Sequence, residues 1–273
     1  MVDALFAGEQ LSKRFGGVVA LTETSLEVRS AEAVGLVGPN GAGKTTLFNC
    51  LLGVVRPDSG SVYFDGRRID GLKLHQRARL GIGRTFQRLE LFSGMTVLDH
   101  LLVAKRARGS GARMWRDLLG IGGPSREEMD DADRVLELVG LSGYAHSMVE
   151  SLSLGHGRLL ELGRAIIGRP RLLMLDEPSS GLDSAETAVL VDVVRKVRAE
   201  TGAALLLVEH DLDMVSVLVD RLYVLDFGKL IADGPIDQVL ADEAVRTAYL
   251  GTASVAGENS AVAGAEAAGV DEL

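Results

Sequence analysis

The sequence has one cysteine and no long apolar run. The single cysteine, Cys50, excludes an internal disulfide framework and a cysteine-based zinc site, and this usage is typical of a reducing compartment. We expect Cys50 to be a small buried apolar residue. The longest apolar runs, such as AALLLV at 203–208, are far shorter than the roughly 20 residues that span a bilayer. Any association with a membrane is therefore expected to go through a partner.

Basic residues are outnumbered by acidic ones, 29 to 38. The net charge of the 273 residues is −9 and no cluster of lysine and arginine occurs, which argues against a nucleic-acid groove, so we expect no nucleic-acid partner. The first ten residues, MVDALFAGEQ, carry acids and no basic stretch, which argues against a secretory signal and predicts a cytoplasmic protein. The 47% hydrophobic and 25% charged residues predict a globular chain with one large or two small domains.

The order of the strand patterns predicts an α/β fold. The first third reads as short strands: SLEVRS alternates, AEAVGLVG is a buried apolar run, and GSVYFDGRRI alternates into a turn at Asp65-Gly66. Further strands are expected in RLLMLDEP, AALLLVEH and RLYVLDFGKLIADG. The first two are continuous apolar runs, typical of parallel strands that are buried on both faces. We therefore expect a mostly parallel core sheet with an antiparallel β flank.

Helical periodicity replaces the strand pattern from about 94 to 169 and predicts an inserted α-helical subdomain. In MDDADRVLELVG, for example, Val135, Leu136 and Val139 share one face, and Gly140 can cap the C-terminus. The insertion also holds an apolar patch around Trp115, which is either a docking hairpin or a loop folded onto its own domain. We favour the loop, because apolar spacing alone does not identify a partner surface.

The chain changes character after residue 251. Alanine and glycine supply 10 of the 22 residues from 252 to 273, together with four acids and no base. This composition predicts a disordered, acidic tail. We therefore expect one folded domain over 1–251, followed by the tail at 252–273.

A glycine-rich stretch, GPNGAGKTT at 38–46, fits the pattern G-x-x-x-x-G-K-[ST] between an apolar strand and a helix that begins near Gly43. Its glycines let successive backbone N–H groups point at the phosphates of a nucleotide, Lys44 reaches the β- and γ-phosphates, and the Thr45 hydroxyl suits Mg²⁺. The alternative is a glycine-rich turn without a ligand. The pattern predicts a P-loop that binds ATP and Mg²⁺ through Gly38, Pro39, Asn40, Gly41, Ala42, Gly43, Lys44, Thr45 and Thr46.

Two carboxylates and a histidine follow apolar strands further along the chain. Asp176 ends the run RLLMLD and is expected to act on Mg²⁺ through water, while Glu177 can polarise an attacking water as a general base. His210 follows LLLVE and can hydrogen-bond the γ-phosphate. Taken alone, a carboxylate or histidine at the end of a strand usually has only a structural role. Together with the P-loop, these residues indicate a catalytic role.

The stretch SLSLGHGRLLELGRA at 151–165 predicts a helix whose first turn carries only small or uncharged side chains before Arg158. A helix N-terminus presents unpaired N–H groups and a partial positive charge, so such a tip suits an anion. The alternative is an ordinary surface helix capped by serine.

Taken in order, these motifs resemble the ATP-binding cassette (ABC) family of transporter ATPases over residues 5–251. The resemblance rests on Walker A at 38–46, Gln87 in GRTFQ, the signature LSLGH at 152–156, Walker B ending at Asp176-Glu177, SSGLD at 179–183 and His210. It also places Phe15 where the family stacks an aromatic ring on adenine, although a core aromatic is the alternative for this residue. The motif order implies a P-loop NTPase fold.

The resemblance implies how the helix tip works. In this family two nucleotide-binding domains pack head to tail, so Ser153 and the N–H of Gly155 are expected to contact the γ-phosphate that lies in the P-loop of the other domain. His156 stands where the family usually has glutamine, and we expect a working site all the same. The resemblance also implies that Gln87 touches Mg²⁺ and the attacking water, while residues 88–92 contact a membrane subunit.

Within the family, GIGRTFQRLELFSGMTVLDHLLVA and VLADEAVRTAYLG resemble the larger ATPase subunit of branched-chain amino-acid importers. The implied partners are integral membrane permease subunits, a second ATPase subunit or a second copy of this chain, and, indirectly, an extracytoplasmic solute-binding protein. The implied location is the cytoplasmic face of the membrane. The alternatives are the ATPase of a urea or amide importer, that of an exporter, a soluble ABC-type ATPase and a regulatory ATPase.

Overall fold

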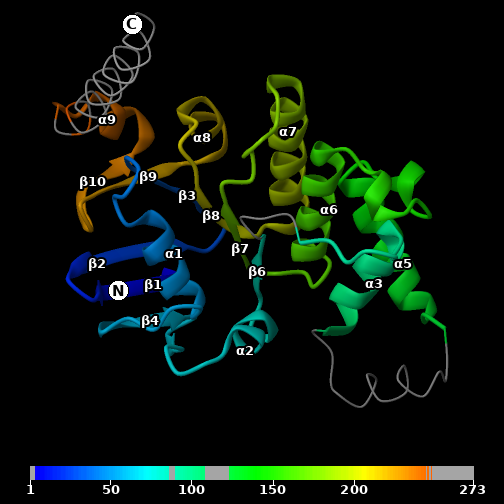
Figure 1. The fold of residues 1–273 in the computed structure, drawn as a ribbon, viewed down its shortest axis with the longest axis horizontal. Helices are drawn as coiled ribbons and strands as arrows, with labels where there is room; N and C mark the ends of the chain where they lie inside the picture. The colour runs from blue at the N-terminus through cyan, green and yellow to red at the C-terminus, as the bar shows by residue number, and fades with distance from the viewer. Residues whose placement is uncertain (1–3, 86–89, 108–122, 244, 246, 248–273) are drawn as a thin grey trace, which may run out of the picture.

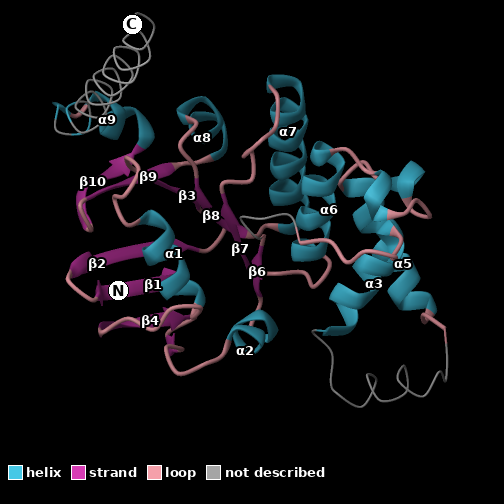
Figure 2. Cartoon of the chain, viewed as in Figure 1, coloured by secondary structure: helices cyan, strands magenta, loops and turns pink. Residues whose placement is uncertain are grey.

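The structure is a computed structural model that describes residues 4–85, 90–107, 123–243, 245 and 247. Its largest sheet has six strands in the order β10-β9-β3-β8-β7-β6 (Figure 2). The first five in chain order pair in parallel, and β10 is antiparallel to β9. Their bounds are β3 Ala33–Val37, β6 Ile82–Arg84, β7 Leu172–Asp176, β8 Ala204–Val208, β9 Arg221–Asp226 and β10 Lys229–Pro235. Every residue of β3, β7 and β8 is buried, which explains their uninterrupted apolar runs.

The second sheet is antiparallel, with the order β2-β1-β4-β5. It contains β1 (Ala4–Phe15), β2 (Val18–Arg29), β4 (Ser59–Phe64) and β5 (Arg67–Arg68). The predicted turn between β4 and β5 is present, with positive φ at Asp65 (52°) and Gly66 (70°). The expectation of short strands is wrong for β1 and β2, which are 12 residues long each. They stay paired along this length because irregularities in register absorb their twist.

Helix α1 (Lys44–Leu52) lies between the two sheets (Figure 1). Its buried residues, such as Leu47 and Phe48, belong to the same apolar cluster as Phe6 of β1 and Leu36 of β3. On the opposite face of the six-stranded sheet, buried apolar residues form a second cluster with helices that come later in the chain. The helix that starts from the P-loop is therefore held rigidly on both sides.

Of the interval between β6 and β7, the described residues form the helices α3 (Val97–Ala107), α5 (Arg126–Leu138) and α6 (Leu154–Ile166), with 3₁₀ turns at Ser142–Tyr144 and Val149–Ser151. They gather at one side of the molecule (Figure 1). The predicted apolar face of α5 is buried, and Gly140, with φ 75°, follows the helix end. The other helices are α2 (Leu74–Arg79), α7 (Ser184–Thr201), α8 (Leu212–Leu218) and α9 (Ile236–Ala241).

These elements confirm the predicted α/β fold with its parallel core and antiparallel flank. Cys50 is buried and free, as expected. The patch around Trp115 and the tail at 252–273 lie outside the described residues. Within the part that is described, no helix is long and apolar enough to cross a membrane.

Candidate functional site

The P-loop connects β3 to α1 and passes between β9 and β2. Two glycines permit this path. A Cβ on Gly38 (φ 154°) would lie 2.1 Å from the carbonyl oxygen of Leu225, and one on Gly43 (φ 104°) would lie 2.5 Å from that of Ala20. The carbonyl of Ala42 accepts a hydrogen bond of 2.8 Å from the N–H of Gly228. The loop is therefore anchored by neighbouring strands, and side chains larger than glycine are excluded where it approaches them.

Lys44 is the first residue of α1 and is buried. Its ammonium group donates to the carbonyl oxygens of Gly38 at 2.6 Å and Pro39 at 3.1 Å, so it curls back over the loop. Burial lowers the pKa of Lys44, and the nearby carboxylates of Glu177 and Asp176 oppose this shift. This ammonium group and the free N–H groups at the start of α1 make the loop suited to phosphate.

The side chain of Asp176 lies at the end of β7 and is only 5% exposed. Its Oδ1 is buried without a hydrogen-bond partner among the described residues. Burial raises the pKa of Asp176 to about 6, with further contributions from the negative charges of Glu177 and Glu209; Lys44 and Arg84 act in the opposite direction. The positive charges of Lys44 and Arg84 therefore compensate the carboxyl group only in part, and a bound cation would supply the remainder.

This environment fits Mg²⁺. An unpartnered carboxylate oxygen is the type of ligand that Mg²⁺ prefers, and Thr45 in the P-loop offers a hydroxyl. Among the residues that the structure describes, no group of three or more His, Cys, Asp or Glu side chains could hold a metal by itself. A site with few protein ligands is typical of Mg²⁺ that is held partly by water and by substrate phosphates.

Glu177 follows Asp176 with a left-handed backbone, φ 46°. Its N–H donates to the carbonyl of Val208 at 2.9 Å, and its own carbonyl accepts from the N–H of Ser180 at 3.1 Å. These bonds hold a non-glycine residue in a conformation that costs energy. The turn lets the carboxylate leave the line of the strand at the same sheet edge as the P-loop.

His210 follows β8 and its side chain is 64% exposed. The residue before it, Glu209, is 0% exposed. Glu209 accepts hydrogen bonds from the N–H and the hydroxyl of Ser179, at 3.0 and 2.6 Å, and from the N–H of His210 at 3.1 Å. The sequence analysis missed Glu209, although a carboxylate at the end of the apolar run LLLVE was a signal for it.

The tip of α6 has the conformation of a capped helix. Ser153 is the N-cap residue, and its hydroxyl accepts a hydrogen bond of 3.2 Å from the N–H of His156. A Cβ on Gly155 would lie 2.7 Å from a carboxylate oxygen of Glu186, so a larger residue there would displace the end of that side chain. The ring of His156 lies 4.3 Å from that of Tyr144. Ser153 itself remains exposed, so the cap and the anion-binding interpretation are compatible.

The structure brings some of the predicted residues together and keeps others apart. The P-loop, Asp176, Glu177 and His210 follow parallel strands at one edge of the six-stranded sheet. Helices α1 and α6 pack on opposite faces of that sheet, so the α6 tip does not join the P-loop of its own chain. Gln87 lies outside the described residues.

Phe15 is 50% exposed, so the interpretation as a core aromatic is wrong. It ends β1, where it pairs with the exposed Val18 at the start of β2. The ammonium group of Lys13 lies 5.4 Å from the centre of the Phe15 ring. The ring is therefore available for stacking on a planar ligand.

Comparison with known proteins defines the class to which this site belongs. The family described as ABC transporter matches residues 21–180, more than half of the chain. This chain belongs to the ABC transporter family, and it is an ATP-hydrolysing cassette of the ABC type.

The most informative relatives are transport ATP-binding proteins. LivG of Salmonella typhimurium, a high-affinity branched-chain amino acid transport ATP-binding protein, is 39% identical over 93% of this chain and 100% of its own length. BraF of Pseudomonas aeruginosa, with the same description, is 40% identical over 89% of this chain and 96% of its own. LptB of Haemophilus influenzae, a lipopolysaccharide export system ATP-binding protein, is 33% identical over 91% of this chain and 98% of its own length.

A solved structure supports the fold. An ATP-binding cassette of an ABC transporter in its ADP conformation aligns with a TM-score of 0.80 at 31% identity, covering 91% of this chain and 99% of that one. A second family description, branched-chain amino acid ATP-binding cassette transporter, matches residues 229–255.

Proposed function

We propose that this chain is the ATP-hydrolysing subunit of an importer for branched-chain amino acids. The observation that carries the proposal is its likeness to LivG and BraF, which extends over nearly the whole of both chains. The match at 229–255 supports the same substrate class independently, because it lies outside the general cassette region at 21–180. The 33% identity to LptB keeps an exporter as the second candidate.

In this proposal the P-loop, from Gly38 to Thr46, holds the phosphates of ATP, and Phe15 stacks on the adenine. Thr45 and Asp176, together with Gln87, hold Mg²⁺, which neutralises charge on the phosphates. Glu177 accepts a proton from the attacking water, and His210 donates a hydrogen bond to the γ-phosphate. The strained backbone of Glu177 and the unpartnered oxygen of Asp176 support these roles. Both features are typical of functional sites that are preorganised for a ligand.

A second cassette completes the site. The tip of α6, with Ser153, Gly155 and His156, lies on the opposite side of the sheet from its own P-loop, and its exposed N-cap suits an anion. We propose that it closes on the nucleotide of a different ATPase subunit or of a second copy. ATP then joins the two cassettes, and hydrolysis separates them.

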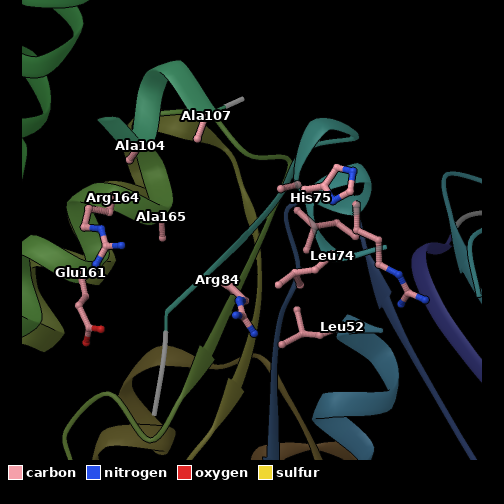
Figure 3. Close-up of a pocket in the computed structure, with 12 residues that line it drawn as sticks. Leu52, Leu74, His75, Arg84, Ala104, Ala107, Glu161, Arg164 and Ala165 are labelled. Carbon is pink, nitrogen blue, oxygen red and sulfur yellow. The ribbon is translucent and has the colours of Figure 1, made fainter. Parts of the chain in front are cut away.

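Docking to a membrane subunit is proposed at a cavity of about 240 Å³ between the sheet and the inserted helices (Figure 3). Leu52 and Leu74 line it from one side, and Ala165 from the other, while Arg84, Glu161 and Arg164 supply charges (Figure 3). Such a hollow, apolar with a few charged groups, fits a short amphipathic helix. The partners would be two permease subunits at the cytoplasmic face of the membrane, served by an extracytoplasmic solute-binding protein.

The test is purification of the tagged chain from detergent-solubilised membranes of its host, followed by mass spectrometry. The proposal predicts two polytopic subunits and a second cassette ATPase, and binding of leucine, isoleucine or valine by the accompanying solute-binding protein. Recovery with lipopolysaccharide-export components would support the second candidate. Recovery from the soluble fraction alone would contradict both.

A further inference from the structure

Several charged residues are buried without being assigned a role at the nucleotide. Three of them are linked by hydrogen bonds around the loop after Glu177: Arg158 and Glu161 on α6 and Glu209 after β8. Buried charges are retained only when hydrogen bonds compensate them, so the partners of these three show what they hold in place. Together they connect the docking cavity to His210.

The first contact attaches the segment at Glu90 to α6. The N–H of Glu90 donates to the carboxylate of Glu161 at 3.3 Å, and the guanidinium group of Arg164 donates to the carbonyl of Glu90 at 2.6 Å. Glu161 and Arg164 also line the docking cavity (Figure 3). An occupant of the cavity would therefore touch the same side chains that hold Glu90.

The second contact runs from α6 to the loop after Glu177. Arg158 donates to Glu161 at 3.1 Å with one nitrogen and to the carbonyl of Ser180 at 3.2 Å with another. Arg158 and Glu161 are one helical turn apart on the buried face of α6. A displacement of Glu161 is thus carried to residues 179–183.

The third contact leads from that loop to His210. Ser179 gives two hydrogen bonds to Glu209, and Glu209 accepts the N–H of His210. Because Glu209 is fully buried, it has no water to replace Ser179 if the loop moves. The loop and His210 are therefore expected to move together.

We propose that Glu161, Arg158 and Glu209 form a polar relay that positions His210 according to the state of the docking cavity. They are positioning residues, because they act on the site only through the hydrogen bonds that end at the backbone N–H of His210. Glu161 pairs directly with Arg158, and Arg158 is linked to Glu209 through Ser180 and Ser179. A shift at one end therefore leaves an unpaired group unless the neighbour follows. This inference rests on the proposed docking of a membrane subunit at the cavity.

The test uses the full-length chain together with its second cassette, ATP and Mg²⁺, and compares Glu161→Gln, Glu209→Gln and the double variant. The relay predicts that each single change lowers kcat about fivefold to tenfold with KM within about twofold, and that the double variant is no slower than the worse single variant. It also predicts that Glu161→Gln shifts the ¹³C-histidine NMR signal of His210, assigned with His210→Gln.

Asp131→Asn is the matched control. Asp131 is also buried in the helical region and paired, with Lys105 and Arg169, but it is not connected to His210 by these contacts. It should lower the melting temperature without changing kcat or the His210 signal. If Glu209→Gln fails to fold, Ser179→Ala replaces it, since it removes one hydrogen bond to Glu209.

Multiplying effects in the double variant and an unmoved His210 signal would overturn the relay. Because these measurements need no membrane subunit, they are independent of the proposed transporter. Failure of the purification experiment would leave the measured link between Glu161 and His210 intact. Conversely, an importer whose Glu161 and Glu209 act independently would retain its function without the relay.

Discussion

The sheet edge and the tip of α6 are both phosphate sites in the proposed mechanism, but they are built in opposite ways. At the sheet edge, Lys44, Asp176 and Glu177 bring charges of both signs onto one rigid frame, and carboxylates exceed the cations. The α6 tip has no charged side chain in its first turn and offers only Ser153, His156 and backbone N–H groups. In this mechanism the sheet edge can bind a nucleotide by itself, whereas the α6 tip contacts only a phosphate that another P-loop holds. The difference explains why the proposed mechanism includes a second cassette.

The strongest test of the sheet edge is Glu177→Gln. The amide keeps the size of the side chain but cannot accept a proton, so turnover should fall on the order of 100-fold to 10,000-fold. Binding of ATP, measured by equilibrium dialysis, should persist, because the P-loop is untouched. Retained turnover would remove Glu177 from the role of general base.

Ser153→Asp separates the two regions. Aspartate caps a helix as well as serine does, but it places a negative charge where the γ-phosphate of the partner should lie, a juxtaposition that costs several kcal/mol. Turnover should fall at least about 100-fold, while the affinity of the same chain's P-loop for ATP stays within about twofold.

The control for this change is Ser153→Asn, which is an equally good cap without the charge. It should retain most of the turnover. Equal losses in the two variants would show that the serine hydroxyl acts through its own helix and not through a phosphate.

Asp131→Asn tests how much the ion pairs of Asp131 stabilise the helical region. Hydrogen bonding to Lys105 holds the pKa of Asp131 below its usual value, assisted by Arg169 and opposed by burial. A lowered pKa contributes stability at neutral pH that is lost as the pH falls through the folded-state pKa. The variant should unfold about 2 kcal/mol more easily at pH 7, and the difference should shrink as the pH falls through the lowered folded-state pKa of Asp131. Urea titrations at neutral and at acidic pH measure it; a difference independent of pH would contradict the ion pair.

Phe15→Ala tests the exposed ring at the end of β1 in the antiparallel sheet. Loss of stacking on adenine is worth about 1 kcal/mol, so ATP should bind about fivefold more weakly. Because the ring is half exposed, the melting temperature should change little. A large loss of stability with unchanged binding would show that the ring is structural.

His156→Gln is expected to have the smallest effect. It restores the residue usual in the family and removes the ring contact with Tyr144. Steady-state turnover should change only a few-fold. A rise above tenfold, which is roughly 1.4 kcal/mol of barrier, would show that histidine weakens the signature.

The order of strand, glycine-rich loop and helix at the sheet edge was predicted correctly, because its signals are local. The P-loop pattern, the strand before it and the helix after it lie within a few residues of one another, as do the strand β7 and Asp176. The lengths of β1 and β2 were missed, since their irregular register breaks the alternation that identifies strands. The exposure of Phe15 likewise depends on where the sheet ends.

The relay residues could not be found in this way. Glu209 meets Ser179 across 30 positions of sequence, and Arg158 meets Ser180 across 22. Only the pairing of β7 with β8 and the packing of α6 bring these groups together. Local periodicity predicts that Arg158 and Glu161 lie on a helix. It does not predict that both side chains are buried, or that Arg158 donates to the carbonyl of Ser180.

The most direct test of the two-part site is a structure, by electron cryomicroscopy, of the Glu177→Gln complex purified from host membranes with ATP and Mg²⁺. The account predicts that the γ-phosphate lies between Lys44 of this chain and the signature helix of a second cassette, and that the α6 tip of this chain faces the second cassette's nucleotide. A nucleotide enclosed by this chain alone, with the α6 tip directed at no phosphate, would contradict it.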